Sequence, residues 1–175
     1  VASLVAASFL RRSPDVEIIP FSDHVVPLPR RLNPRDSVMT NAQYLASLPS
    51  GGTSCSAPLR YMNQMNAEAD LVVYVSDNQS WSDFGSNAAQ AARVPARCLA
   101  STPMAEEWER FRKRNPHAKL VLIDIQPYAH TQVADRADVL NVGGFSDSVF
   151  EIVSLFAKGE MQGARFVSAI ESVKL

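Results

Sequence analysis

The sequence predicts an α/β fold built on a doubly wound, mostly parallel sheet with one antiparallel edge strand. Four short apolar runs are rich in β-branched residues: Val16–Phe21, Leu71–Val75, Leu120–Ile125 and Val139–Val142. Helical stretches lie between most of these runs. Runs without polar alternation are typical of parallel strands that helices cover on both faces. A fifth run, His24–Pro29, follows the first after only Ser22 and Asp23. So short a gap permits a hairpin and excludes a parallel crossover, so this run is the predicted antiparallel strand.

Prolines and end signals define the remaining elements. Pro27 and Pro29 lack a backbone N–H, which confines their strand to the edge of the sheet. The clearest helix begins at Pro103 after Thr102, a good N-cap, and its early glutamates and late arginines complement the helix dipole. This helix is expected to run to Asn115. Others are expected over Ala2–Arg12, Asp36–Leu48, Ala57–Asn66, Asp147–Lys158 and Gln162–Lys174, with a long, partly helical connection over Ser80–Ala100.

Composition limits the class of protein. The 175 residues fit one domain, and a net charge of -1 with 46% hydrophobic residues favours no nucleic-acid or membrane partner globally. Cys55, Cys98 and three scattered histidines form no zinc pattern, and such sparse cysteine suits a reducing cytoplasm. The apolar residues at the start are too few to cross a bilayer, which takes about 20. We therefore expect a cytoplasmic domain with no membrane partner.

Ligands of a doubly wound sheet bind beyond the carboxyl ends of its strands. Polar residues follow three of the predicted strands there, namely Ser22, Asp23, Ser76, Asp77, Asn78 and Gln126, the last followed by Pro127. Asp77 is notable because a carboxylate directly after a buried strand has its backbone fixed and its side chain directed into the crevice. The alternative is that Asp77 caps the following turn by bonding its own backbone.

The loop "SGGTSCSAPL", Ser50–Leu59, has three interpretations: a phosphate-binding loop, a metal-binding loop or a helix cap. Pro58 belongs in the first turn of a helix that starts near Ser56. The phosphate interpretation is weak, because the loop follows a helix, contains no Lys and fits neither glycine-rich fingerprint. The metal interpretation uses the Thr53 hydroxyl with the Asp77 carboxylate, oxygen donors that suit Mg²⁺.

The order "FSD", "SGGTSCSAPL", "VVYVSDNQSW" and then "GGF" before an amphipathic helix resembles the von Willebrand factor A domain of the Ro autoantigen family. The similarity covers roughly Val1 to Lys158. Such domains resemble integrin I domains and carry a metal-ion-dependent adhesion site. The resemblance implies a Mg²⁺ or similar divalent cation held by a D-x-S-x-S motif, a Thr of the second loop and an Asp after the fourth strand. Thr53 and Asp77 match the last two.

One part of the family pattern is not in the sequence. No D-x-S-x-S occurs, and the family places that motif and its central strand just before the helix with which this chain opens. The chain also starts without Met, in the middle of a pattern. We therefore expect an N-terminally incomplete domain over residues 1–175, whose vacant strand position beside Leu71–Val75 is filled by other residues, by a second copy or by rearrangement.

The resemblance implies binding rather than catalysis: a metal-dependent module of a Ro-like ribonucleoprotein that recognises a protein partner, whose carboxylate would complete the Mg²⁺ shell. Full-length relatives join this domain to a ring of helical repeats that holds small noncoding Y RNAs and misfolded RNAs. RNA association is therefore expected of the parent protein rather than of this domain. A competing hypothesis is a nucleotide-binding α/β enzyme that uses the Gly51–Thr53 loop and Asp77. A third is a structural domain whose metal site has decayed.

Other side chains could form binding sites or belong to ordinary structure. The basic stretches at Arg11, Pro29–Arg35 and Glu109–Lys119 could meet phosphates, although solvated faces are more common. Trp81 and Phe84 could form a partner surface or be part of the core. Cys55 stands near a helix start, but without a neighbouring His we expect a buried structural thiol.

Overall fold

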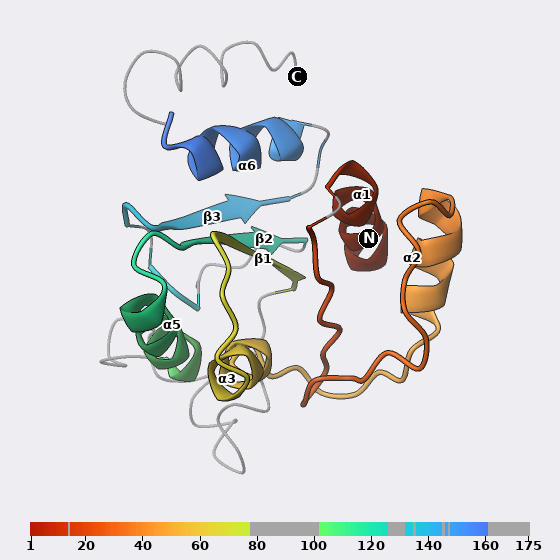
Figure 1. Ribbon diagram of the computed structural model, residues 1–175, viewed down its shortest axis with the longest axis horizontal. Coiled ribbons are helices and arrows are strands. Elements are labelled where there is room, and N and C mark those ends of the chain that lie inside the picture. The colour runs from red at the N-terminus through yellow and green to blue at the C-terminus, as the bar shows by residue number, and fades with distance from the viewer. Residues whose placement is uncertain are drawn as a thin grey trace.

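A computed structural model describes the chain at residues 1–13, 15–77, 102–125, 132–134, 136–144, 146 and 148–160. In chain order its elements are α1 (Ala2–Arg12), α2 (Val38–Ala46), α3 (Ala57–Gln64), β1 (Leu71–Ser76), α5 (Pro103–Arg114), β2 (Lys119–Asp124), β3 (Val139–Gly143) and α6 (Ser148–Lys158). Helices lie on both sides of the sheet, as Figure 1 shows, with α6 and α1 on one face and α3 and α5 on the other. The predicted α/β doubly wound class is confirmed.

The described sheet has three parallel strands in the order β1-β2-β3. Leu71 pairs with Lys119 and Ser76 with Asp124 at the two ends of the β1–β2 ladder. Because β2 has a neighbour on each side and a helix layer on each face, its residues from Leu120 to Asp124 are all buried. This explains the continuous apolar run that predicted it.

Alternate residues of β2 belong to two separate cores. Leu120 and Leu122 pack with Trp108, Phe111 and the other buried residues of the α3–α5 side. On the opposite face, Val121 and Ile123 join a cluster with residues of α1 and α6 that includes Val5, Val153 and Phe156. The period-2 alternation of a strand therefore divides one apolar run between two helix layers.

The helix ends follow the capping signals of the sequence. The Thr102 hydroxyl accepts a hydrogen bond from the Ala105 N–H at 3.1 Å, and Pro103 opens α5 as predicted. Ser37 caps α2 in the same way, through the Thr40 N–H at 3.0 Å. Because this cap fixes the start, α2 begins at Val38 rather than at Asp36.

The two predicted strands between α1 and α2 are wrong as strands. Val16–Phe21 and His24–Pro29 form no ladder, and their only bridge is an isolated antiparallel one between Phe21 and Val25. The reversal of chain direction predicted for this segment is present. The strands are not: neither run pairs with the described sheet, in which β1 pairs only with β2. Pro20, Pro27 and Pro29 supply no backbone N–H for a ladder. The expected helix at Gln162–Lys174 and connection at Ser80–Ala100 lie outside the described residues.

Candidate functional site

The carboxyl ends of the three strands form one edge of the sheet, toward which all arrows point in Figure 1. Ser76 of β1, Asp124 of β2 and Gly143 of β3 lie in register across this edge. The Gly144 N–H donates to the Asp124 carbonyl at 2.7 Å, which continues the parallel pairing just beyond β3. Asp77 follows β1 directly and is half-buried, so its backbone is fixed at this edge as predicted.

The loop that carries Thr53 is tied to the turn at Ser22. The Ser54 N–H donates to the Ser22 carbonyl at 2.7 Å. Gly51 lies against the same turn, where a Cβ on it would stand 3.7 Å from Asp23 Oδ1. Thr53 is half-buried between these anchored positions, and Ser54, Cys55 and Ser56 are buried. The expectation that Cys55 is a buried thiol is confirmed, with 1% of its surface exposed.

An aromatic contact links this turn to β1. The rings of Phe21 and Tyr74 meet edge to face, with 5.7 Å between their centroids. Since Phe21 precedes Ser22 and Tyr74 lies three residues before Asp77, the contact holds the turn and its attached loop against β1. The fold therefore anchors both predicted metal-ligand segments to β1, one by chain connectivity and one through this turn. Coordination by Thr53 and Asp77 together stays a prediction.

Two further carboxylates belong to the loops and strand ends discussed above. Asp23 Oδ1 accepts from Ser22 Oγ at 3.0 Å and lies 2.6 Å from His24 Nδ1. The Ser22 hydrogen bond, and then His24, lower the pKa of Asp23 below its ordinary value of 3.8. Asp124 is 8% exposed at the end of β2. Sequence reasoning gave Asp124 no role, although a carboxylate inside the apolar run "LVLIDI" was a signal.

Few of the described side chains at this edge of the sheet could bind a metal ion. Within the part of the chain that the structure describes, no group of three or more His, Cys, Asp or Glu side chains is placed to hold a metal ion. The candidate ligands are a hydroxyl and a carboxylate, which fit Mg²⁺ because that ion keeps several waters and often takes only one or two carboxylates from a protein.

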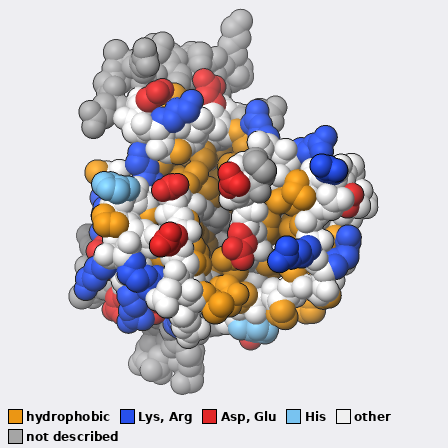
Figure 2. Space-filling model, viewed as in Figure 1, with side chains coloured by type: hydrophobic (Ala, Val, Ile, Leu, Met, Phe, Trp, Pro, Cys, Tyr) orange, Lys and Arg blue, Asp and Glu red, His pale blue; other side chains and the backbone are white. Residues whose placement is uncertain are grey.

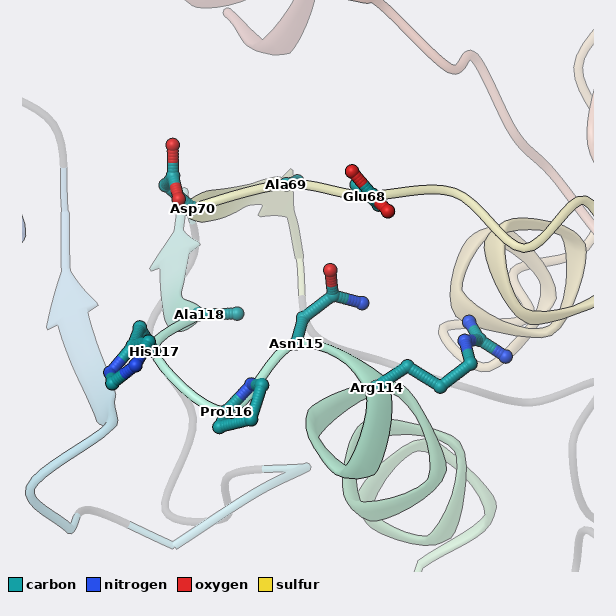
Figure 3. Close-up of a pocket in the computed structure, with 8 residues that line it drawn as sticks. All are labelled: Glu68, Ala69, Asp70, Arg114, Asn115, Pro116, His117 and Ala118. Atoms are coloured by element: carbon teal, nitrogen blue, oxygen red, sulfur yellow. The ribbon is translucent and has the colours of Figure 1, made fainter.

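A hollow of about 360 Å³ lies at the opposite edge of the sheet, before β1 and β2 begin. Residues 68–70 form one wall and residues 114–118 the other, as Figure 3 shows. Its charged side chains are Glu68, Asp70 and Arg114. Figure 3 shows His117 at the end of the hollow opposite Arg114. Sequence reasoning did not identify this hollow, because it arises where two connections far apart in sequence face each other.

Each predicted basic stretch has at least one arginine engaged within the protein. Arg11 donates to the Pro34 carbonyl at 2.9 Å, and the Arg30 guanidinium stacks over the Tyr44 ring at 4.1 Å. In the third stretch, Arg112 pairs with Asp138 at 3.2 Å. Lys and Arg side chains nevertheless gather over α5, at the lower left of Figure 2. Trp81 and Phe84 lie outside the described residues.

The parallel sheet between two helix layers, with its loops at the carboxyl edge, has the architecture of the von Willebrand A class. The family model for the Ro60 vWA domain matches residues 1–94, more than half of the chain. The chain therefore belongs to the Ro60 vWA domain family.

A sequence relative agrees with this assignment, and a solved structure shares the fold. The RNA-binding protein RO60 of Deinococcus radiodurans is 27% identical over 161 residues, which cover 91% of this chain and 26% of the relative. The crystal structure of the Deinococcus radiodurans RO (RSR) protein matches with a TM-score of 0.67 at 22% identity, over 91% of this chain and 30% of that one. The chain thus spans about a quarter of the length of the curated relative. None of the helices in the described ranges is both long and apolar enough to span a bilayer.

Proposed function

We propose that this domain is a metal-dependent protein-binding module of a Ro-like ribonucleoprotein, and that it acts by binding rather than by catalysis. The observation that carries the proposal is the carboxyl edge of the sheet in a Ro60 vWA family domain. There Asp77 follows β1, while the Thr53 loop is bonded to the turn that packs on the same strand.

The chemistry of the donors supports Mg²⁺ as the cofactor. Thr53 would supply a neutral hydroxyl oxygen and Asp77 a carboxylate oxygen, both hard ligands. Two protein ligands leave positions for water and for one incoming group. A carboxylate from a partner protein would bind such a site well, since it adds a charged oxygen to an incompletely neutralised cation. This chain's residues would hold and orient the ion, and the partner would complete its shell.

RNA association is proposed for the longer protein rather than for this domain. The curated relative is named an RNA-binding protein, and this chain matches only 26% of it. Small noncoding Y RNAs are the class that we propose for the parent protein. The sparse cysteines support a cytoplasmic location for it.

Calorimetric titration of the chain with Mg²⁺ and Mn²⁺ tests the metal proposal. Asp70→Ala is a matched control, because Asp70 precedes β1 at the opposite edge, whereas Asp77 follows it. We expect heat of binding in the unchanged chain and in Asp70→Ala, and a loss of at least about tenfold in affinity in Asp77→Ala and Thr53→Val.

Binding that survives Asp77→Ala would contradict the metal assignment. Binding of ADP in the absence of metal would instead favour the nucleotide-binding enzyme. Absence of ion binding by the unchanged chain would point to the structural domain with a decayed site.

A further inference from the structure

Helices α3 and α5 carry three arginines on the surface along the line where they pack. Arg60 belongs to α3, and Arg110 and Arg114 belong to α5, one helical turn apart. All three residues are exposed, with 51% of the Arg60 side chain and 64% of the Arg110 side chain accessible. Their guanidinium groups are nevertheless held in place by groups buried beneath them.

Glu107 is the first of these anchors. Its side chain is 10% exposed, and it lies 3.8 Å from Arg60 Nε and 3.1 Å from Arg110 Nη1. A buried carboxylate needs such partners, because leaving it unpaired is strongly destabilising. The Ser56 hydroxyl accepts a hydrogen bond from Arg60 Nη2 at 3.0 Å. Both arginines are therefore fixed by structure rather than left as freely moving surface chains.

Asn63 is the second anchor, and it connects the third arginine to the first two. Its side-chain N–H donates to Glu107 Oε2 at 2.7 Å, and its oxygen accepts from Arg114 Nη2 at 2.9 Å. The network contains three guanidinium charges and one carboxylate. It therefore keeps a net charge of two positive units, with unused N–H donors because each guanidinium has five.

Two exposed apolar side chains lie in the second half of α3 and at its C-cap, after Arg60. Helical spacing places Tyr61 and Met65 one turn apart on the same side of the helix, and Tyr61 directly follows Arg60 in the sequence. Met65 is 63% exposed and Tyr61 37%. Tyrosine, methionine and arginine are enriched in protein–protein interfaces, where lysine and glutamate are depleted.

We propose that these five residues, Arg60, Tyr61, Met65, Arg110 and Arg114, form a docking surface for an acidic segment of a partner protein. Carboxylates of that segment would bind the fixed guanidinium groups, and one apolar side chain would cover Tyr61 and Met65. Binding to arginines that are already ordered costs less conformational entropy than binding to mobile ones. The surface uses none of the candidate metal ligands.

A protein segment fits this surface better than a nucleic acid. The apolar part consists of a thioether and one phenol ring, which suit an aliphatic or aromatic side chain. Single-stranded RNA is usually held by several aromatic rings on which successive bases stack. Tyr61 is the one aromatic residue in the surface defined here.

Fluorescence anisotropy with the whole 175-residue chain tests the proposal. The probe is a short labelled peptide of Glu and Asp with one central Trp, and its counterpart has Gln and Asn in place of the acids. We expect the acidic peptide to bind more tightly than its counterpart. Added salt should weaken the binding of the acidic peptide. The double variant Arg110→Gln/Arg114→Gln should weaken binding about fivefold or more.

The matched control is Arg31→Gln/Arg35→Gln, which removes the same charge from exposed residues elsewhere and should change binding by less than about twofold. Met65→Ser leaves the arginine network intact and should also lower the affinity for the acidic peptide. This second variant keeps the proposal testable if the arginine variant does not fold. Equal affinity for both peptides, or equal loss in the control, would overturn the proposal. Tighter binding of labelled oligouridine that depends on Arg110 and Arg114 would reassign the surface to RNA.

Discussion

The segment from β1 to β2 and the segment between α1 and α2 contain similar apolar runs but have different structures. Leu71–Ser76 and Lys119–Asp124 form a paired parallel ladder between two helix layers. Val16–Phe21 has comparable composition, yet Phe21 makes only an isolated bridge with Val25. The difference shows that an apolar, β-branched run supplies the tendency to form a strand, whereas a neighbouring strand is needed to realise it.

The two segments also differ in how their aromatic residues are buried. Trp108 is 0% exposed, stacks on Phe111 at 5.6 Å and donates its indole N–H to Asp138 at 2.9 Å. Phe21 is only half-buried and packs at the margin of the same core. Trp108 therefore lies at the centre of the core, whereas Phe21 mainly positions a loop.

The largest expected effect comes from truncating these two aromatics. Trp108→Ala should lower the free energy of unfolding by about 3 to 5 kcal/mol, because it leaves a cavity in the core and removes a partner of Asp138. Phe21→Ala should cost about 1 to 2 kcal/mol, since less apolar surface is lost. Urea unfolding followed by circular dichroism measures both. Equal losses would show that residues 16–29 are as well packed as the sheet.

A smaller effect is expected at the amino end of β2. Lys119 Nζ donates to the Phe156 carbonyl at 2.6 Å and the Ala157 carbonyl at 3.1 Å, which stabilises the last turn of α6. Lys119→Met keeps most of the apolar stem but removes both bonds, so we expect the free energy of unfolding to fall by about 0.5 to 1.5 kcal/mol.

Lys113→Met is the matched control for this substitution, as Lys113 is exposed on α5. It should change the free energy of unfolding by less than about 0.5 kcal/mol. If Lys119→Met also changed the free energy of unfolding by less than about 0.5 kcal/mol, the contact between β2 and the end of α6 would contribute little to stability.

The smallest effect concerns the loop region, at Asp23. The pKa of this carboxylate is lowered by Ser22 first and then by His24, so its ionised form is favoured in the folded state. The resulting stabilisation is present above the unfolded pKa and is lost as the pH falls through the lower, folded pKa. We expect Asp23→Asn to be slightly less stable than the unchanged chain at neutral pH, with the difference disappearing well below pH 3.8.

Thermal unfolding of both proteins over this pH range checks the prediction. A difference between them that stays constant into strong acid would contradict it, because protonation would then have no part in the effect.

Much of the fold could be predicted because its signals are local. Thr102 and Pro103 define the start of α5 by bonds within one turn, and the chain follows them. The apolar run at β2 predicted burial on both faces, which the two clusters confirm. For the candidate site, the position of Asp77 after a strand was predictable from the same run.

Other features depend on residues distant in sequence. The pairing of Glu107 with Arg60, and of Arg114 with Asn63, requires α3 and α5 to pack together, so these charges could only be described as basic stretches. The hollow between residues 68–70 and 114–118 has the same origin.

The sequence by itself determined the α/β class, the start of α5 at Thr102 and Pro103, and the placement of Asp77 after a strand, because these depend on propensity, capping and side-chain period. Tertiary structure alone decided which apolar runs become strands and which arginines become fixed. Both outcomes require a partner supplied by another part of the chain: a neighbouring ladder for Leu71–Ser76, and a buried carboxylate, Glu107, for Arg60 and Arg110.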